Sequence, residues 1–233
     1  MKFPLTGHGW REMLIGTVLL AAVAVGLGWI WRPLALLALP PLVFLFAFFR
    51  DPQRLVPADA SIVVSPADGT VSDVTELPHD ELLGGPAVRI GIFLSVFNVH
   101  VNRSPCGGCV LETRYKKGKF VNALKHNQAS SENESNTIIL GEPASKRPVA
   151  VVKQIVGAIA RRIICTVGRG DQVQRGQRIG MIKFGSRTEL YLPKWLAPQV
   201  TVKVGDKLRG AADVVAILGR PIEKTTTEAE AKA

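Results

Sequence analysis

The stretch GDQVQRG occupies residues 170–176, and a similar stretch, GDKLRG, occupies residues 205–210. In each, a Gly-Asp pair precedes a short run that ends in a second glycine. Glycine adopts the positive φ angles that tight turns need, and aspartate accepts hydrogen bonds from the backbone of a turn. The two copies start 35 residues apart. They predict an internal repeat of β hairpins and therefore a β-rich domain.

Both copies resemble the Gly-Asp hairpin turns of lipoyl and biotinyl carrier domains. This resemblance implies a small β-sandwich whose strands are swapped around a pseudo-twofold axis. Carrier domains also have a Met-Lys-Met or Asp-Lys-Ala turn that holds the carrier lysine, and neither copy is followed by one. The resemblance therefore concerns the fold alone.

From Ser61 onward, the sequence pattern predicts β structure. Short runs of Val, Ile and Thr are separated by Gly, Pro, Asn and Asp, which is typical of strands joined by turns. We expect helices only at about residues 121–129 and 192–197, and a disordered polar tail at residues 225–233. The predicted fold class is mainly β, a sandwich-like or barrel-like domain over residues 51–224.

Two apolar stretches, residues 13–31 and 33–49, precede this domain. Each is close to the lower limit for a membrane-spanning helix, which needs about 20 residues. Arg32-Pro33 separates the two stretches, and Pro40-Pro41 is expected to kink the second. We expect a hydrophobic helical hairpin over residues 1–50 that anchors the chain, either spanning the membrane or lying in it as a re-entrant pair. A cleaved signal peptide is the alternative.

Positive charge favours a particular orientation and partner. Arg11, Arg50 and Arg54 flank the apolar stretches on the same side, which predicts an inner-membrane protein with its β-rich domain on the cytoplasmic side. The net charge is +10, and residues 101–186 hold 15 Lys and Arg against 5 Asp and Glu. A basic surface of this kind favours nucleic acid or an acidic membrane. Because nucleic-acid-binding motifs are lacking, the membrane is favoured over a surface without a partner.

Cysteine and histidine spacing does not indicate a metal site. Cys106 and Cys109 form a C-x-x-C motif, but a zinc site needs a second pair or nearby histidines. A redox motif normally opens a helix, whereas this one follows Pro105 in a strand-and-turn region. We expect two thiols that flank a Gly-Gly turn, no metal, and Cys165 as a small buried apolar side chain.

The pair Gly185-Ser186 can carry out chemistry on its own peptide bond. Glycine permits the strained turn that brings the serine hydroxyl against the preceding carbonyl. An N→O acyl shift, β-elimination and hydrolysis would then cut the chain and leave a pyruvoyl group at position 186. Gly-Ser pairs are common in ordinary turns, so the surrounding sequence has to decide between these interpretations.

Several further motifs accompany this pair in a fixed order. They are FFRDPQR (48–54), SPADGTV (65–71), FLS (93–95), NVHVNRSP (98–105), KFVNA (119–123), SSENE (130–134) and GAIARRI (157–163). Together they resemble a phosphatidylserine decarboxylase of the short bacterial type, over about residues 48–218. Each motif is weak alone, and their order makes the resemblance specific.

The resemblance implies self-cleavage between Gly185 and Ser186, giving a β chain (1–185) and an α chain (186–233). Ser186 then becomes a covalent pyruvoyl cofactor that forms a Schiff base with the substrate amine. The implied reaction converts phosphatidylserine to phosphatidylethanolamine and CO2. The implied partners are the lipid, the membrane and the other chain of the same precursor, with no nucleic acid. Many family members have threonine after the serine, whereas this chain has Arg187.

Ser186 needs a base, because a serine hydroxyl is hardly nucleophilic at neutral pH. His100 lies on an apolar strand within a family motif, and the resemblance implies that Asp68 orients it as in a catalytic triad. Long-form relatives have a second histidine where this chain has Arg103. Arg103 is therefore a candidate substrate-binding residue. Phe184, which directly precedes the Gly185-Ser186 pair, is another, and His126 is a further candidate base.

Two alternatives remain open at this point. The first is a decarboxylase of another serine phospholipid, such as an archaeal-type ether lipid. The second is a membrane-anchored β-sandwich adaptor without enzymatic activity. A chain that remains uncut on a denaturing gel would favour the adaptor.

Overall fold

The computed structural model describes residues 4–121, 126–157, 162–183 and 185–222 of the 233-residue chain. The chain divides into two compact units, Met1–Gln53 and Arg54–Ala233.

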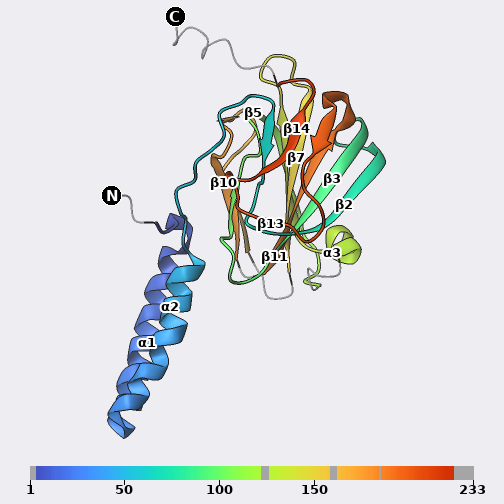
Figure 1. Ribbon diagram of the computed structural model, residues 1–233. Coiled ribbons are helices and arrows are strands. Elements are labelled where there is room, and N and C mark those ends of the chain that lie inside the picture. Colours follow the sequence, from blue (N-terminus) through green and yellow to red (C-terminus); the bar gives the residue numbers. More distant parts are fainter. Residues whose placement is uncertain (1–3, 122–125, 158–161, 184, 223–233) are drawn as a thin grey trace, which may run out of the picture. The chain divides into compact units, whose positions relative to one another are not determined.

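The first unit is a hairpin of apolar helices (Figure 1). Its elements are η1 (Gly7–Gly9), α1 (Trp10–Ile30), η2 (Arg32–Ala38) and α2 (Leu39–Phe48). Gly16 lets the two long helices approach each other, because a Cβ on this residue would lie 2.6 Å from the side chain of Leu45. At the open end of the hairpin, the Thr6 N–H donates to the Phe49 carbonyl at 2.8 Å. The helical hairpin expected from the sequence is confirmed.

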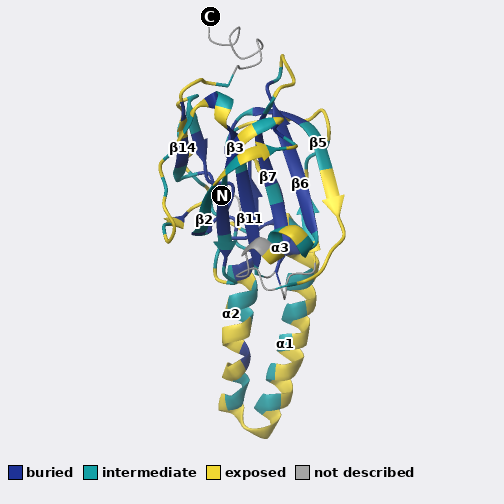
Figure 2. Ribbon diagram, turned by 90° about the vertical axis from the view of Figure 1, so that its right-hand side faces the viewer, coloured by how far each residue is buried: buried dark blue, intermediate teal, exposed yellow. Residues whose placement is uncertain are grey.

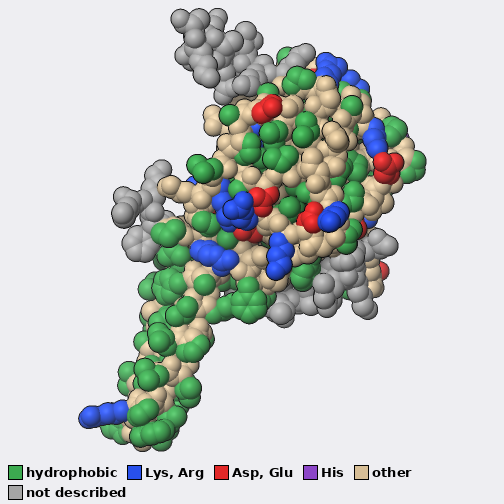
Figure 3. Space-filling view, viewed as in Figure 1, with side chains coloured by type: hydrophobic (Ala, Val, Ile, Leu, Met, Phe, Trp, Pro, Cys, Tyr) green, Lys and Arg blue, Asp and Glu red, His purple; other side chains and the backbone are tan. Residues whose placement is uncertain are grey.

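The hairpin exposes apolar side chains along its length (Figure 3). The apolar 18-residue stretch within Gly7–Ile30 has a mean hydropathy of 2.3, and this segment is long and apolar enough to cross a membrane, while the apolar segment Arg32–Phe48 is shorter. The break occurs at Trp31, as the Arg32-Pro33 pair predicted. The expected kink at Pro40-Pro41 stays a prediction, and the second apolar stretch changes from a 3-10 helix to an α-helix just before these prolines. These prolines lie in the first turn of α2, where proline is tolerated because its missing N–H would have no partner.

The second unit is mainly β. Its strands are β1 (Ile62–Val64), β2 (Gly69–Asp80), β3 (Gly85–Leu94), β4 (Val101–Arg103), β5 (Gly108–Lys116), β6 (Ser135–Gly141), β7 (Pro148–Val156), β8 (Arg162–Cys165), β9 (Gln172–Val173), β10 (Arg178–Lys183), β11 (Ser186–Pro193), β12 (Pro198–Val200), β13 (Lys207–Leu208) and β14 (Val214–Leu218). Two short helices accompany them, α3 (His126–Glu132) and η3 (Lys194–Leu196).

Eight of these strands form one sheet in the order β13-β2-β3-β11-β7-β6-β5-β9, and it curls into a half-barrel. Two three-stranded sheets accompany it, in the orders β4-β10-β8 and β1-β14-β12. The inner face of the large sheet carries the main hydrophobic core, with Ile90, Ile92, Leu190 and Val152 among its fully buried side chains (Figure 2). Strand β11 lies near the middle of the sheet, between β3 and β7. The mainly β, barrel-like fold is therefore confirmed.

The internal repeat predicted from the two Gly-Asp turns is present. Each aspartate carboxylate accepts a hydrogen bond from the backbone three residues earlier, Asp171 from Gly168 at 2.8 Å and Asp206 from Lys203 at 2.9 Å. Gly170 and Gly205 have φ angles of +96° and +95°. The strand after the first turn, β9, pairs with β5, and the strand after the second, β13, pairs with β2. The two copies thus close opposite edges of the large sheet.

The repeat extends to two segments that the sequence analysis did not connect. Residues 65–71 (SPADGTV) and 104–110 (SPCGGCV) take equivalent places. Ser65 and Ser104 each donate from the hydroxyl to the carbonyl two residues later, at 2.7 Å in both cases. The Val71 N–H donates to Asp206 at 2.9 Å, and the Val110 N–H donates to Asp171 at 2.8 Å. The C-x-x-C motif is therefore the symmetry counterpart of a segment that contains Asp68, and the residue equivalent to Asp68 is Gly107.

The structure contains a helix in the first of the two predicted ranges and only a short 3-10 turn in the second. Helix α3 (His126–Glu132) overlaps the helix expected at about 121–129, of which residues 122–125 lie outside the described ranges. The helix expected at 192–197 is wrong in its first half, since Leu192 and Pro193 continue β11 and only Lys194–Leu196 form a 3-10 turn. Pairing of β11 with Val88 and Ala87 of β3 overrides the local helical preference.

Candidate active site

Ser186 is the first residue of β11, and it is fully buried. Its backbone pairs with Leu94 at the end of β3 and with Val156 at the end of β7. Gly185, just before it, has a φ angle of +61°, which only glycine adopts readily. The backbone therefore turns sharply at the peptide bond expected to be cut. Strands β3 and β7 hold the serine that follows this bond.

His100 lies against this turn. Its Nε2 atom is 3.3 Å from the Gly185 amide nitrogen, and its Nδ1 atom is 3.0 Å from the carbonyl oxygen of Asn98. A carbonyl can only accept a hydrogen bond, so Nδ1 carries the proton and Nε2 accepts from the Gly185 N–H. The imidazole is thus neutral, with its basic nitrogen directed at the Gly185-Ser186 segment.

The Ser186 hydroxyl is buried and has no hydrogen-bond partner among the residues that the structure describes. Leaving a buried hydroxyl unpaired costs free energy, about 1–3 kcal/mol, so such a group calls for an explanation. Conversion of Ser186 to a pyruvoyl group is such an explanation. It would consume the hydroxyl, and loss of the hydroxyl breaks no described contact. The surroundings of Ser186 therefore fit that group.

Asp68 stands at the entry to β2. Its carboxylate accepts hydrogen bonds from the Arg54 guanidinium at 2.7 Å and from the Gly210 N–H at 2.8 Å. These contacts fix the loop that precedes β2 against the second Gly-Asp hairpin. The pairing of Asp68 with His100 in a triad stays a prediction.

The remaining candidate residues from the sequence are Arg103, Phe184 and His126. Arg103 lies in β4, and its Nη1 donates to the Gly176 carbonyl at 3.1 Å. It lines a hollow of about 360 Å³ together with Arg175 and Arg178. Its role in substrate binding stays a prediction. Phe184 and the side chain of His126 lie outside the described parts of the chain.

A chain of buried amide and hydroxyl groups lies beside Ser186 on the inner face of the sheet. The Asn102 amide donates to the Thr188 hydroxyl at 3.0 Å, and Gln154 donates to Asn102 at 2.9 Å. Asn136 donates to Gln154 at 2.9 Å. These groups join β4, β6, β7 and β11 at the end where Ser186 lies. Asn102 falls within a recognised motif, but nothing in the sequence indicated that the four residues meet.

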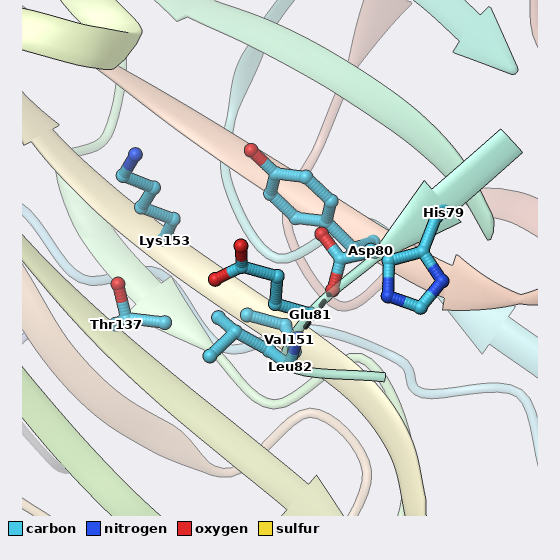
Figure 4. Close-up of a pocket in the computed structure, with 8 residues that line it drawn as sticks. His79, Asp80, Glu81, Leu82, Thr137, Val151 and Lys153 are labelled. Carbon is cyan, nitrogen blue, oxygen red and sulfur yellow. Dashed lines mark hydrogen bonds between the residues drawn. The ribbon is translucent and has the colours of Figure 1, made fainter. Parts of the chain in front are cut away.

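The opposite face of the sheet carries charged groups instead. Side chains alternate along a strand, so Arg187, Glu189 and Tyr191 point away from the face of Ser186. A hollow of about 300 Å³ lies on this outer face, with Lys153 and Thr137 on one side and His79 and Asp80 on the other (Figure 4). Tyr191 also lines it. Burial lowers the pKa of Lys153, and the neighbouring cations add to this effect against the charge of Glu189. This hollow is therefore separate from the Ser186 site.

Within the described ranges, no group of three His, Cys, Asp or Glu side chains is arranged to hold a metal ion. Cys106 and Cys109 are buried free thiols, and Cys165 is partly buried. The Cys106 thiol lies one residue before the Gly107-Gly108 pair that leads into β5.

The sequence matches the phosphatidylserine decarboxylase family model over residues 42–216. The chain belongs to the phosphatidylserine decarboxylase family. That stretch includes Gly185, Ser186, His100 and Asp68 and thus the whole candidate site. The family assigned from the order of motifs is confirmed.

Individual relatives extend the match to most of the chain. It is 42% identical to a phosphatidylserine decarboxylase proenzyme of Rhodopirellula baltica, over 92% of this chain and 88% of the relative. It is 41% identical to one of Burkholderia vietnamiensis, over 94% and 99%. It is 48% identical to one of Carboxydothermus hydrogenoformans, over 75% and 80%. The chain is thus a member of an enzyme family, and the non-enzymatic adaptor considered from the sequence is wrong.

Proposed function

We propose that this decarboxylase cuts itself between Gly185 and Ser186 and then converts phosphatidylserine to phosphatidylethanolamine and CO2. The observation that carries the proposal is the buried Ser186 hydroxyl, which has no partner among the described residues and follows a glycine with positive φ whose amide nitrogen lies 3.3 Å from His100 Nε2. The names of the relatives as proenzymes support a precursor that is processed.

The cut begins when Ser186 Oγ attacks the carbonyl carbon of Gly185. His100 Nε2, 3.3 Å from the Gly185 nitrogen, is the nearby base that takes the hydroxyl proton. The peptide C–N bond breaks and an ester forms. Loss of the Cα proton of residue 186 expels the Gly185 carboxylate and leaves dehydroalanine. Water then replaces the nitrogen, which leaves as ammonia, so that a pyruvoyl group remains and no oxidant or reductant is needed.

The pyruvoyl group supplies an electron sink for decarboxylation of a substrate that carries a primary amine. The protein positions residue 186 for this reaction through the backbone ladders of β11 with β3 and β7. Beside it, Thr188 and Asn102 fix the inner face of the sheet through their hydrogen bond. A site built on paired strands holds its reacting atom more precisely than a site on a loop.

We further propose that the helical hairpin attaches the enzyme to the inner membrane and that the β-rich unit works on the cytoplasmic side. The exposed apolar surface of α1 and α2 and the positive Arg11, Arg50 and Arg54 support this arrangement. Its purpose would be to keep the active site close to a lipid substrate.

The cleavage is tested by gel electrophoresis and intact-mass measurement of the purified protein. We expect two fragments, residues 1–185 and 186–233. The small one should resist Edman sequencing, because a ketone replaces its amino group. Ser186→Ala should remain uncut and inactive, since alanine has no hydroxyl to attack or to eliminate. Ser104→Ala is a control that removes another fully buried hydroxyl, one that donates to the Cys106 carbonyl, and it should still be cut. A first Edman cycle that yields serine from an active enzyme would refute the pyruvoyl group.

A further inference from the structure

Arg187, the second residue after the proposed cut, is among the largest fully buried side chains in the described parts of the protein. Three of its nitrogens donate hydrogen bonds. Nη2 binds Asp73 Oδ2 at 2.5 Å, Nη1 binds Ser72 Oγ at 2.5 Å, and Nε binds Glu189 Oε1 at 2.9 Å. The guanidinium is thus held on several sides at the outer face of the sheet, next to the strand end that carries Ser186.

The neighbouring strands are shaped to receive this side chain. A Cβ at Gly91 of β3 would lie 2.1 Å from Arg187 Nη2 and 2.3 Å from Asp73 Oδ2, so only glycine leaves room for the ion pair. The register of β2 against β3 shifts between Val71 and Asp73. This irregularity places the consecutive residues Ser72 and Asp73 where both contact Arg187, although side chains of consecutive residues normally point to opposite faces.

The charge on Asp73 is maintained at neutral pH. Burial alone would raise the pKa of this carboxyl, but the hydrogen bond and charge of Arg187, with help from Ser72 and Arg89, hold the pKa below its ordinary value of 3.8. Asp73 is therefore ionised wherever the enzyme is expected to work, and its ion pair with Arg187 is fully formed.

The proposed cut places the members of this cluster on two separate fragments. Asp73 and Ser72 belong to the large fragment (residues 1–185), whereas Arg187 and Glu189 belong to the small fragment (186–233). Glu189 makes a second connection, because its carboxylate also accepts a hydrogen bond from Ser130 of α3 at 3.0 Å. Within four residues of its new end, the small fragment therefore has two side chains that bind the large fragment through charged groups.

A freshly cut chain end frays unless it is tied down. Before the cut, residue 186 is held by covalent bonds on both sides. After the cut, it is a terminal residue, and displacement by about 1 Å can cost on the order of a hundredfold in rate. We propose that Arg187 is a positioning residue that holds the new end of the small fragment in register, by binding Asp73 and Ser72 of the large fragment. This inference rests on the proposed self-cleavage.

Hydrogen exchange measured on the cut and the uncut protein tests this role. Arg187→Met keeps the length of the side chain and removes its charge. In the cut enzyme, we expect amide exchange over residues 187–190 to become about tenfold faster, since the strand end then opens more often. In the uncut Ser186→Ala background, the same substitution should change the exchange of these residues much less. Equal acceleration in both backgrounds would show a merely structural role and overturn the proposal.

Steady-state kinetics on detergent micelles that contain phosphatidylserine provides the second measurement. Arg187→Met should lower kcat about tenfold and leave KM nearly unchanged, because the residue positions the reacting group and does not touch the substrate. Arg187→Lys should recover part of kcat, since it restores the charge but not the forked geometry. Unchanged kcat in fully cut Arg187→Met would refute the inference. Arg114→Met is the control, because Arg114 has an exposed ion pair with Glu112 and no link to the cut.

If Arg187→Met fails to fold, Asp73→Asn replaces it, since asparagine preserves shape and removes one charge. This variant should show the same difference between the cut and uncut backgrounds, and its absence would equally overturn the proposal. The outcomes also separate this inference from the proposed function. A wild-type chain that stays whole contradicts the self-cleavage, whereas a wild type that is cut, with Arg187 variants that behave normally, contradicts only the positioning role.

Discussion

His100 has one nitrogen against Gly185 and the other against the Asn98 carbonyl. This geometry provides a neutral base without requiring a carboxylate partner. We therefore expect His100→Ala to accumulate the uncut precursor, because the substitution removes the imidazole nitrogen that lies 3.3 Å from the Gly185 amide nitrogen. A time course on gels, followed together with CO2 release, measures this.

The matched variant Asp68→Asn separates two roles for this carboxylate. If Asp68 orients His100, the variant should cut more slowly. If it only fixes the loop at Arg54 and Gly210, cutting should proceed at the wild-type rate. Normal cutting together with poor turnover in His100→Ala would instead assign His100 to the decarboxylation cycle. In that case Arg103 and His126 become the next positions to test.

Cys106 is expected to be chemically inert in the folded protein. Burial raises the pKa of its thiol to about 12, despite the opposing charge of Arg175. Only the thiolate reacts with maleimides, so at pH 8 only about one molecule in ten thousand is reactive. We expect Cys106 to be labelled only after unfolding, as measured by mass spectrometry of peptides. Labelling of native Cys106 at the rate of the partly buried Cys165 would contradict this.

Sequence reasoning proposed the reacting residues but could not predict their surroundings. Gly185, Ser186 and His100 stand out because their chemistry is tied to residue type and local order. The environment of Arg187 could not be predicted in this way. Its partner Asp73 is distant in the chain, and their meeting depends on a strand irregularity and on the missing Cβ of Gly91. Such contacts are determined by the register of three strands together.

At the scale of elements, the two Gly-Asp hairpins offer a test of the internal repeat. A Cβ at Gly170 or Gly205 would meet no atom within 4 Å, so alanine changes only the backbone preference. Both glycines have φ near +95°. Each Gly→Ala substitution should therefore lower the free energy of unfolding by a similar amount, about 1–2 kcal/mol.

Thermal or denaturant unfolding of the uncut Ser186→Ala background measures these losses without interference from the cut. Gly168→Ala serves as the control, because it is equally open but does not have a positive φ angle. Very different losses at the two hairpins would show that the copies are not equivalent in stability, despite their matching hydrogen bonds.

The sequence predicted the two hairpins because turn chemistry is local. It did not predict that SPADGTV and SPCGGCV occupy equivalent places, since the two share little besides Ser-Pro, a glycine and a valine. Their equivalence is defined by backbone hydrogen bonds to the hairpins, such as Val71 to Asp206 and Val110 to Asp171. Backbone pairing tolerates almost any side chain, so it leaves few signs in the sequence.

At the scale of the whole molecule, the two units should be separable. A chain that starts at Asp51 should fold, because the β-rich unit has its own buried core. It should bind vesicles of anionic lipid less well than the full chain. Its remaining binding should weaken with salt, because the basic surface is screened over about 10 Å at 0.1 M ionic strength.

Vesicle sedimentation at several salt concentrations measures this, and neutral vesicles provide the control for the electrostatic part. If removal of residues 1–50 leaves binding unchanged at every salt concentration, the hairpin is not the anchor.

The place of β11 inside the large sheet has a consequence for the lifetime of the enzyme. In a chain cut as proposed, the small fragment would provide this inner strand, so the sheet could close only while both fragments are present. Before the cut, folding is a first-order process in which the chain itself keeps the strand at high effective concentration. After the cut, a denatured enzyme would have to recover the strand by a bimolecular encounter, which becomes slow on dilution. The proposed cut would therefore make folding practically irreversible, and the working life of each enzyme molecule would be set by its rate of unfolding rather than by its equilibrium stability.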